Sequence, residues 1–305
     1  MRTIKQLALV LATGYIFVYF SEHLFWARLR PDDSLKNWFS AWIAYSLMAF
    51  IFLHLVTSFR IAEKSSLFLA GAAFGWLAEG LVVQTTYESL PLSISFTGLA
   101  WHALITGWSG WDAVRRALTS PASIRTFGLF AVIGAGYGLW AITWWLEPDG
   151  GVATLAEFSR FSLTITALVT LAYALANWGA SAPFAPNRWV TRVIYGLFLL
   201  YFAFVTIPAA PWALLILPIL LGLVTYGLRR HRPVEETDSL IVTLGGRIPP
   251  LNFLAIFALP LTAIAVYAAA LSLNLQWHTN WILYLITTPL GFVLFGVGLF
   301  KKRST

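Results

Sequence analysis

The residues that could do chemistry in this sequence are few, and they lie inside long apolar stretches. Glu22 and Glu79 are the only acidic residues within such stretches, and His23, His54 and His102 are the histidines found there. An ionisable side chain inside a bilayer costs about 2.5–3.5 kcal/mol on insertion scales, so it marks a candidate functional site. A carboxyl group beside an imidazole can exchange protons, which serves either proton-coupled transport or general acid–base catalysis.

Helical spacing predicts which way these side chains face. Gly71, Gly75 and Glu79 are four residues apart, and two glycines at this spacing allow close contact with another helix. Glu79 should therefore point into a helix bundle, with Gln84 near the outer rim and His102 as a partner from the next helix. Proton-coupling or substrate residues are expected among the following: Glu22, His23, Glu79, Gln84 and His102.

Further polar residues recur at helical spacing and could line a cavity that opens outward between the helices of stretches 6–26, 66–86, 92–111 and 161–180. The candidates are Tyr15, Tyr19, Thr86, Thr106, Thr170, Tyr173 and Asn177. The hydroxyl side chains could instead join neighbouring helices. The acidic and histidine candidates also have structural alternatives: Glu79 could pair with His102 for stability, and Glu22 and His23 could lie at head-group level. We expect His54 to be a packed core histidine.

Other chemistries lack their required residues. The chain contains no Cys and no His-x-x-x-His or Glu-x-x-His pair, so no metal site is predicted. The sequence Gly107-Trp108-Ser109-Gly110 has a G-x-S-G form, but no later apolar stretch supplies a histidine partner, so we interpret it as a small-residue helix end. No cofactor is identified, although a pigment bound by a lone histidine stays open.

The composition shows which elements must position these residues. The 305 residues are 59% hydrophobic and 11% charged, with a mean hydropathy of +0.75, whereas soluble domains are about 25% charged. Continuous apolar runs of about 20 residues predict membrane-spanning helices. The sequence therefore predicts an all-α, polytopic membrane helix bundle of about ten transmembrane helices: 6–26, 38–58, 66–86, 92–111, 126–146, 161–180, 189–207, 211–228, 251–273 and 281–300.

The placement of Lys and Arg predicts the orientation of the bundle. Sixteen of the 20 basic residues fall at one end of the predicted helices, and Arg28, Arg30, Lys36 and Arg160 fall at the other. The positive-inside rule then puts both termini in the cytoplasm, in a cell membrane such as an inner membrane. The net charge of +7 thus reflects the membrane topology and favours contact with anionic membrane lipids. The sequence has no basic domain that could bind nucleic acid.

We expect a single transmembrane domain over residues 1–305, made of two five-helix halves. Residues 1–146 carry the polar intramembrane residues, 147–160 form an outer loop, and 161–305 form an apolar half with a cytoplasmic loop at 229–250 that could contain a short strand or an interfacial segment. Three functions stay open. The first is a transporter that moves a small or lipid-linked solute and is coupled to protons through Glu79. The second is a membrane subunit that holds partner chains, other copies of itself or a pigment. The third is an enzyme that acts on a lipid or isoprenoid at the outer leaflet.

Overall fold

The chain is a multi-pass helical protein. The computed structural model describes residues 1–30, 33–147, 150–233 and 239–301, and every element in these ranges is a helix. Within them, nine helices are long and apolar enough to span a membrane, which confirms the all-helical, multi-pass part of the predicted fold. They are Arg2–Trp26, Leu35–Ser58, Lys64–Val82, Ser123–Trp145, Leu155–Gly179, Arg188–Ala209, Ala213–His231, Pro250–Ser272 and Thr279–Phe300.

The stretch expected to span the membrane at 92–111 is helical but is not among these nine. It forms α5 (Leu92–Ser95), η4 (Phe96–Ala113) and α6 (Val114–Thr119) without a break. The helix therefore continues past the predicted boundary, and Asp112 lies on it rather than in a loop. An ion pair between Asp112 and Arg116, one turn apart and 2.9 Å between Oδ1 and Nε, supports this extension.

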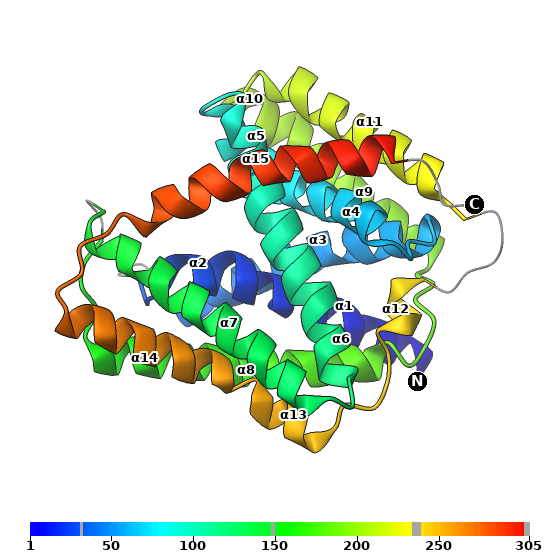
Figure 1. Cartoon of the computed structure of the whole chain (residues 1–305). Helices are drawn as coiled ribbons and strands as arrows, with labels where there is room; N and C mark the ends of the chain where they lie inside the picture. The colour runs from blue at the N-terminus through cyan, green and yellow to red at the C-terminus, as the bar shows by residue number, and fades with distance from the viewer. Residues whose placement is uncertain (31–32, 148–149, 234–238, 302–305) are drawn as a thin grey trace.

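This oblique helix lies at the centre of the bundle. Figure 1 shows it running from α5 to α6 between two groups of helices. One group holds α4 (Lys64–Trp76), α9 (Arg188–Tyr201), α11 (Ala213–His231) and α15 (Thr279–Phe300). The other holds α7 (Ser123–Ala141), α8 (Leu155–Gly179), α13 (Pro250–Ala255) and α14 (Ala258–Ser272). Helix α4 packs along η4, and α1 (Arg2–Val18) packs between α3 (Leu35–Ser58) and α8.

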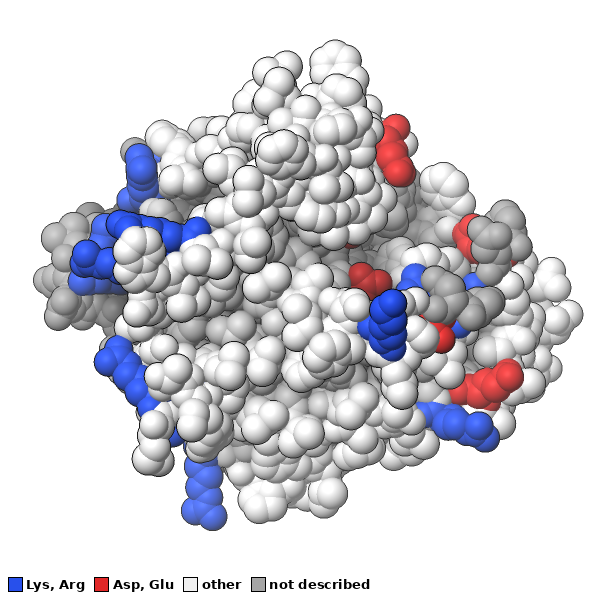
Figure 2. All heavy atoms as spheres, turned by 180° about the vertical axis from the view of Figure 1, so that it is seen from behind, with Lys and Arg blue, Asp and Glu red and all other residues white. Residues whose placement is uncertain are grey.

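Hydrogen bonds between distant segments define one end of the bundle. Lys5 Nζ donates to Ser181 Oγ, and Lys301 Nζ donates to Glu63 Oε2. Figure 1 shows the first residues of α1 and the last residues of α15 at the same end of the bundle. On the face that Figure 2 shows, one end carries Lys and Arg without Asp or Glu, the other end carries Asp and Glu together with some Lys and Arg, and a broad uncharged belt lies between them. We call the end that holds both termini the basic end, and the opposite end the acidic end.

The loop expected at 229–250 contains no strand in its described part, so that alternative was wrong. Residues Leu240–Thr243 form a short helix, α12, whose first backbone N–H donates to the Ile61 carbonyl. Asn177 from α8 also donates its side-chain amide to the Gly246 carbonyl. Some charges used in the topology argument lie outside the described residues: Asp32, Asp149, Glu235, Glu236, Asp238, Lys302 and Arg303.

Candidate functional site

Most residues of the candidate site lie on helical segments with a locally widened turn. Three π-helical segments meet in the bundle: η1 (Tyr19–His23), η2 (Leu77–Val82) and η4. Segment η1 carries Ser21 and Glu22, η2 carries Glu79, and η4 carries His102. Such segments interrupt the regular hydrogen-bond pattern and are frequent at functional sites.

Close helix contact places Glu79 beside η4, as the glycine spacing predicts. A Cβ atom at Gly75 would overlap the Gly98 carbonyl oxygen, and one at Gly71 would lie 3.0 Å from the Ala103 Cα. The backbones of α4 and η4 can approach this closely only because both positions on α4 lack a side chain. Glu79, one turn beyond Gly75, therefore faces η4 and the bundle interior.

Glu79 and His102 form the central contact of the site. Glu79 Oε1 lies 2.7 Å from His102 Nε2. His102 is 2% exposed, while the side chain of Glu79 is 14% exposed. Thr85 donates its hydroxyl to the other carboxylate oxygen, Oε2. Both oxygens of Glu79 therefore have a partner, and its side chain is the less completely buried member of the pair.

The second nitrogen of His102 continues the polar chain into the bundle. His102 Nδ1 lies 2.8 Å from Ser21 Oγ, and Ser21 Oγ lies 2.9 Å from Thr106 Oγ1. Ser21 and Thr106 are both buried, at 5% and 0% exposure. Glu79, His102, Ser21 and Thr106 thus form one connected chain of hydrogen bonds, which we call the relay chain.

Glu22 lies next to the relay chain with its own partners. Tyr45 from α3 donates its hydroxyl to Glu22 Oε1 at 2.6 Å, and Trp26 Nε1 donates to Oε2 at 3.1 Å. Glu22 also lines a small cavity of about 50 Å³ at the acidic end. That volume is sufficient to hold water.

Other residues expected at the site have structural partners nearby. Gln84 adopts a left-handed backbone conformation with φ of 68°, and its amide donates to the carbonyls of Leu81 and Val82. It therefore caps the end of η2. His23 is buried beside the Trp38 ring, and its Nε2 has no hydrogen-bond partner among the described residues. Thr86 is fully buried beneath the same turn.

Most of the expected cavity-lining residues lie away from the relay chain. Tyr19 bonds to Thr166 of α8, Tyr173 donates to the Gly110 carbonyl, and Thr170 bonds back to its own helix. Asn177 lies at the basic end, where it bonds to Gly246. The polar groups of α8 therefore bond to α1 and to backbone carbonyls, whereas α3, which was not among the four helices expected to line the cavity, supplies the Tyr45 hydroxyl to Glu22.

Two more placements differ from the sequence interpretation. Tyr15 lies against the His23 ring at 5.9 Å between centroids, and its buried hydroxyl has no partner in the described part of the chain. His54 is only partly buried and its Nδ1 lies 3.0 Å from the Tyr195 hydroxyl, so it is not a packed core histidine. It lies instead where α3 and α9 face each other.

Sequence reasoning missed three residues of the site: Ser21, Tyr45 and Thr85. Ser21 directly precedes Glu22, and this position next to an intramembrane acid is the signal in the sequence that could have identified it. Tyr45 and Thr85 gave no such signal, since tyrosine and threonine are common near helix ends. Their roles depend on a contact between α3 and α1 and on the turn after η2, which only the tertiary structure shows.

The site contains only side-chain acids, imidazoles and hydroxyls. In the described part of the chain, no three His, Asp or Glu side chains gather closely enough to hold a metal ion. The chemistry that this arrangement can perform on its own is the uptake, storage and release of protons. No family model, curated protein or solved structure matches the chain.

Proposed function

We propose that this protein is a membrane transporter that couples the movement of a small or lipid-linked solute to protons through Glu79 and His102. The observation that carries this proposal is the 2.7 Å contact between Glu79 and His102 inside the bundle. A carboxyl and an imidazole in contact share protons with a small change in geometry. Such a pair inside a membrane protein is a common element of proton pathways in pumps and transporters.

Proton uptake at this pair would reverse the direction of the hydroxyl bonds behind it. When His102 is neutral with its proton on Nε2, Nδ1 accepts a hydrogen bond from Ser21. When His102 is charged, Nδ1 donates, and Ser21 must then donate to Thr106 instead. The protonation state of the pair would thus be transmitted to Ser21 on η1 and to Thr106 on η4.

Access to the pair supports transport from the acidic end. Glu79 is the partly exposed member of the relay chain, and Glu22 lines the small cavity at the same end. We assign Glu22 to the entrance and Glu79 to the coupling step.

A proteoliposome experiment tests this proposal. Vesicles containing the protein and an internal pH dye are given an outside-acid gradient together with sets of amino acids, sugars, organic acids or short-chain polyprenyl phosphates. We expect one set to produce protein-dependent proton uptake, which Glu79→Gln abolishes while the variant still purifies as a folded protein. Full coupled uptake by Glu79→Gln would overturn the proposal.

A second candidate function is an enzyme acting on a lipid or isoprenoid at the outer leaflet. It is favoured by the contact of Ser21 Oγ with His102 Nδ1, since a serine, a histidine and a carboxylate in series can activate the serine as a nucleophile. A serine-reactive fluorophosphonate probe distinguishes the two functions. Labelling that Ser21→Ala removes supports the enzyme, whereas an unlabelled protein with coupled uptake supports the transporter.

We also propose ten membrane-spanning helices with both termini in the cytoplasm. An even number of crossings would bring both ends of the chain to one end of the bundle, where Figure 1 draws them, and the helix Leu92–Thr119 would be the tenth crossing. The basic end would then face the cytoplasm. Because the chain has no Cys, Ala185→Cys and Gly151→Cys each give a single thiol for labelling in intact cells. An impermeant maleimide should label only the second, and labelling of only the first would reverse the orientation.

A further inference from the structure

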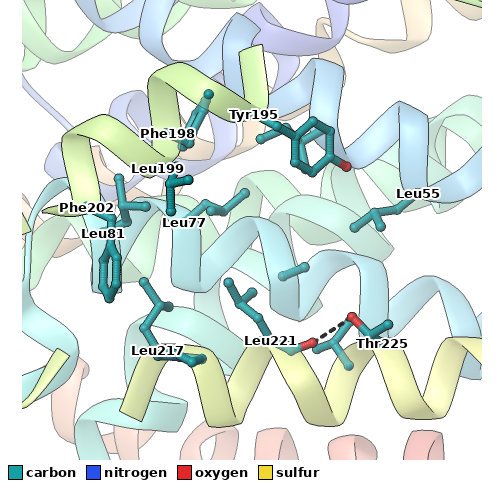
Figure 3. A pocket seen from close by; sticks show the side chains of 15 residues that line it. Leu55, Leu77, Leu81, Tyr195, Phe198, Leu199, Phe202, Leu217, Leu221 and Thr225 are labelled. Atoms are coloured by element: carbon teal, nitrogen blue, oxygen red, sulfur yellow. Dashed lines mark hydrogen bonds between the residues drawn. The ribbon is translucent and has the colours of Figure 1, made fainter. Parts of the chain in front are cut away.

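A long apolar groove lies on the side of the bundle, away from the relay chain. It has a volume of about 520 Å³ and is bordered by α3, α4 with η2, α9 and α11. Figure 3 shows Leu77, Leu199, Phe202 and Leu217 arranged around it. Its lining is almost entirely hydrocarbon, so it suits an acyl or prenyl chain rather than a polar solute.

The groove is open because α9 stands apart from the bundle. Ile194 is the only buried residue of α9 in the structure described. On α4, by contrast, every residue from Ser66 to Trp76 is buried. A gap between helices that faces the membrane cannot stay empty, because unfilled space forfeits dispersion contacts on both sides. Lipid chains are the abundant molecules that can fill it.

A polar pocket lies at the end of this groove. It has a volume of about 430 Å³ and is lined by residues of α3, the loop before α9 and the first turns of α9. The 3.0 Å contact between His54 Nδ1 and the Tyr195 hydroxyl joins the two cavities, since His54 lines the pocket and Tyr195 lines the groove. The polar lining consists of His54, Thr57, Ser58, Arg188, Thr191 and Arg192.

One face of α9 connects the two cavities. Arg188, Arg192, Tyr195, Leu199 and Phe202 are spaced by four, three, four and three residues, so they form a continuous stripe along the helix and its π-helical extension η6 (Phe202–Thr206). The stripe begins with two cations, passes a tyrosine and ends with hydrocarbon. This order matches a lipid with an anionic head group at the membrane surface.

The two arginines are available to an anion. Neither Arg188 nor Arg192 forms an ion pair within the described residues, and both are exposed. Arg192 lies over the Trp189 ring at 5.1 Å, which holds its guanidinium near the membrane surface. The loop before α9 is tied to the N-terminus by the bond from Gln6 to the Pro183 carbonyl, so the pocket lies at the basic end.

We propose that the pocket and groove together bind one anionic phospholipid, with its phosphate on Arg188 and Arg192 and an acyl chain along Tyr195, Leu199 and Phe202. The guanidinium groups present paired N–H donors that suit phosphate oxygens. His54 and Thr191 lie close enough to line the head-group site. This site is separate from the relay chain and does not depend on the proposed transport.

Native mass spectrometry of the purified protein tests the site with defined lipids. The protein is reconstituted in nanodiscs of palmitoyl-oleoyl phosphatidylglycerol mixed with phosphatidylcholine, released, and scored for retained lipid. We expect one retained phosphatidylglycerol in the wild type. Arg188→Gln with Arg192→Gln should lower its affinity by about 25-fold, because each cation near an anionic head group contributes about fivefold. The matched control, Arg229→Gln with Arg230→Gln, removes two exposed arginines at the same end and should retain the lipid.

A groove variant tests the acyl-chain part independently. Gly196 lines the groove, and a Cβ built there meets nothing within 4 Å, so Gly196→Phe fills the groove without disturbing the backbone. Gly222 is equally open on α11 but is not a lining residue, which makes Gly222→Phe its control. We expect Gly196→Phe to lose the retained lipid and Gly222→Phe to keep it.

Two results would overturn the proposal. One is unchanged phosphatidylglycerol retention in both the double arginine variant and Gly196→Phe. The other is competition by soluble glycerol 3-phosphate as strong as that by the lipid, with Gly196→Phe unaffected, because this would show a site for a free phosphate compound. Weak competition by glycerol 3-phosphate, together with lipid loss in Gly196→Phe, supports the lipid.

Discussion

Glu79 and His102 lie 2.7 Å apart although 23 residues separate them in the chain. The contact joins η2 to η4, two π-helical segments whose close packing depends on glycines of α4. Thr85 bonds the free oxygen of Glu79, and Ser21 bonds the free nitrogen of His102. The pair is thus held from both sides, and a change in its protonation must be transmitted to its neighbours.

Replacement of Glu79 by Gln should abolish proton exchange at the site and leave the fold intact. Gln keeps the shape of Glu and can still bond to His102, but it cannot take up a proton. The measurement is infrared difference spectroscopy after a pH jump, in which the carboxyl C=O band of Glu79 should disappear. Glu63→Gln is the control, because Glu63 lies on the exposed surface at the basic end and should leave that band unchanged. A band that persists in Glu79→Gln would assign the proton to another acid.

Replacement of Ser21 by Ala should destabilise the protein by about 1–3 kcal/mol, because it leaves the buried Nδ1 of His102 without its partner. Thermal unfolding in detergent, followed by tryptophan fluorescence, measures the change. Ser272→Ala serves as control, since Ser272 is exposed and bonds only to its own helix. Its effect should stay within about 0.5 kcal/mol. Equal unfolding temperatures for both variants would contradict a structural role for the relay chain.

The helices could be predicted from the sequence because an apolar run is a one-dimensional signal. The stretch 281–300, for example, corresponds to α15 at Thr279–Phe300. The direction of Glu79 could also be predicted, since Gly71 and Gly75 share its face and mark the side that meets another helix. These inferences require only the regular helical period and the cost of a charge in lipid.

The partners of the acids could not be predicted in the same way. The π-helical turn from Tyr19 to His23 shifts side chains from the faces that a 3.6-residue period assigns, so Ser21 turns toward His102. Tyr45 reaches Glu22 because α3 packs along α1, and no local pattern specifies that neighbour. The polar face of α8 instead bonds to α1 and to backbone groups, as Thr166 and Tyr173 show.

Addition of a methyl group at Gly75 should destabilise the protein strongly. The Cβ of Gly75→Ala would overlap the Gly98 carbonyl oxygen, so α4 and η4 must move apart. Overpacking of this kind costs about 1–3 kcal/mol. It should also weaken the contact between Glu79 and His102, and therefore reduce proton exchange. The control is Gly128→Ala, where a Cβ meets nothing within 4 Å, and the readouts are unfolding temperature and the Glu79 infrared band. A normal band in Gly75→Ala would show that the pair does not depend on this packing.

The ion pair between Glu63 and Lys301 should make stability depend weakly on pH. The hydrogen bond from Lys301 holds the pKa of Glu63 below its usual value. Because the pKa of Glu63 is lowered in the folded state, the pair stabilises the protein at pH values above the usual carboxyl pKa. This stabilisation is lost as the pH falls through the pKa of Glu63 in the folded protein. Both side chains are 40% or more exposed, so the pair contributes at most about 1 kcal/mol. The unfolding temperature of Glu63→Gln should therefore lie slightly below that of the wild type at pH 7, and the two should converge in acid. A difference that grows toward low pH would contradict the sign of this effect.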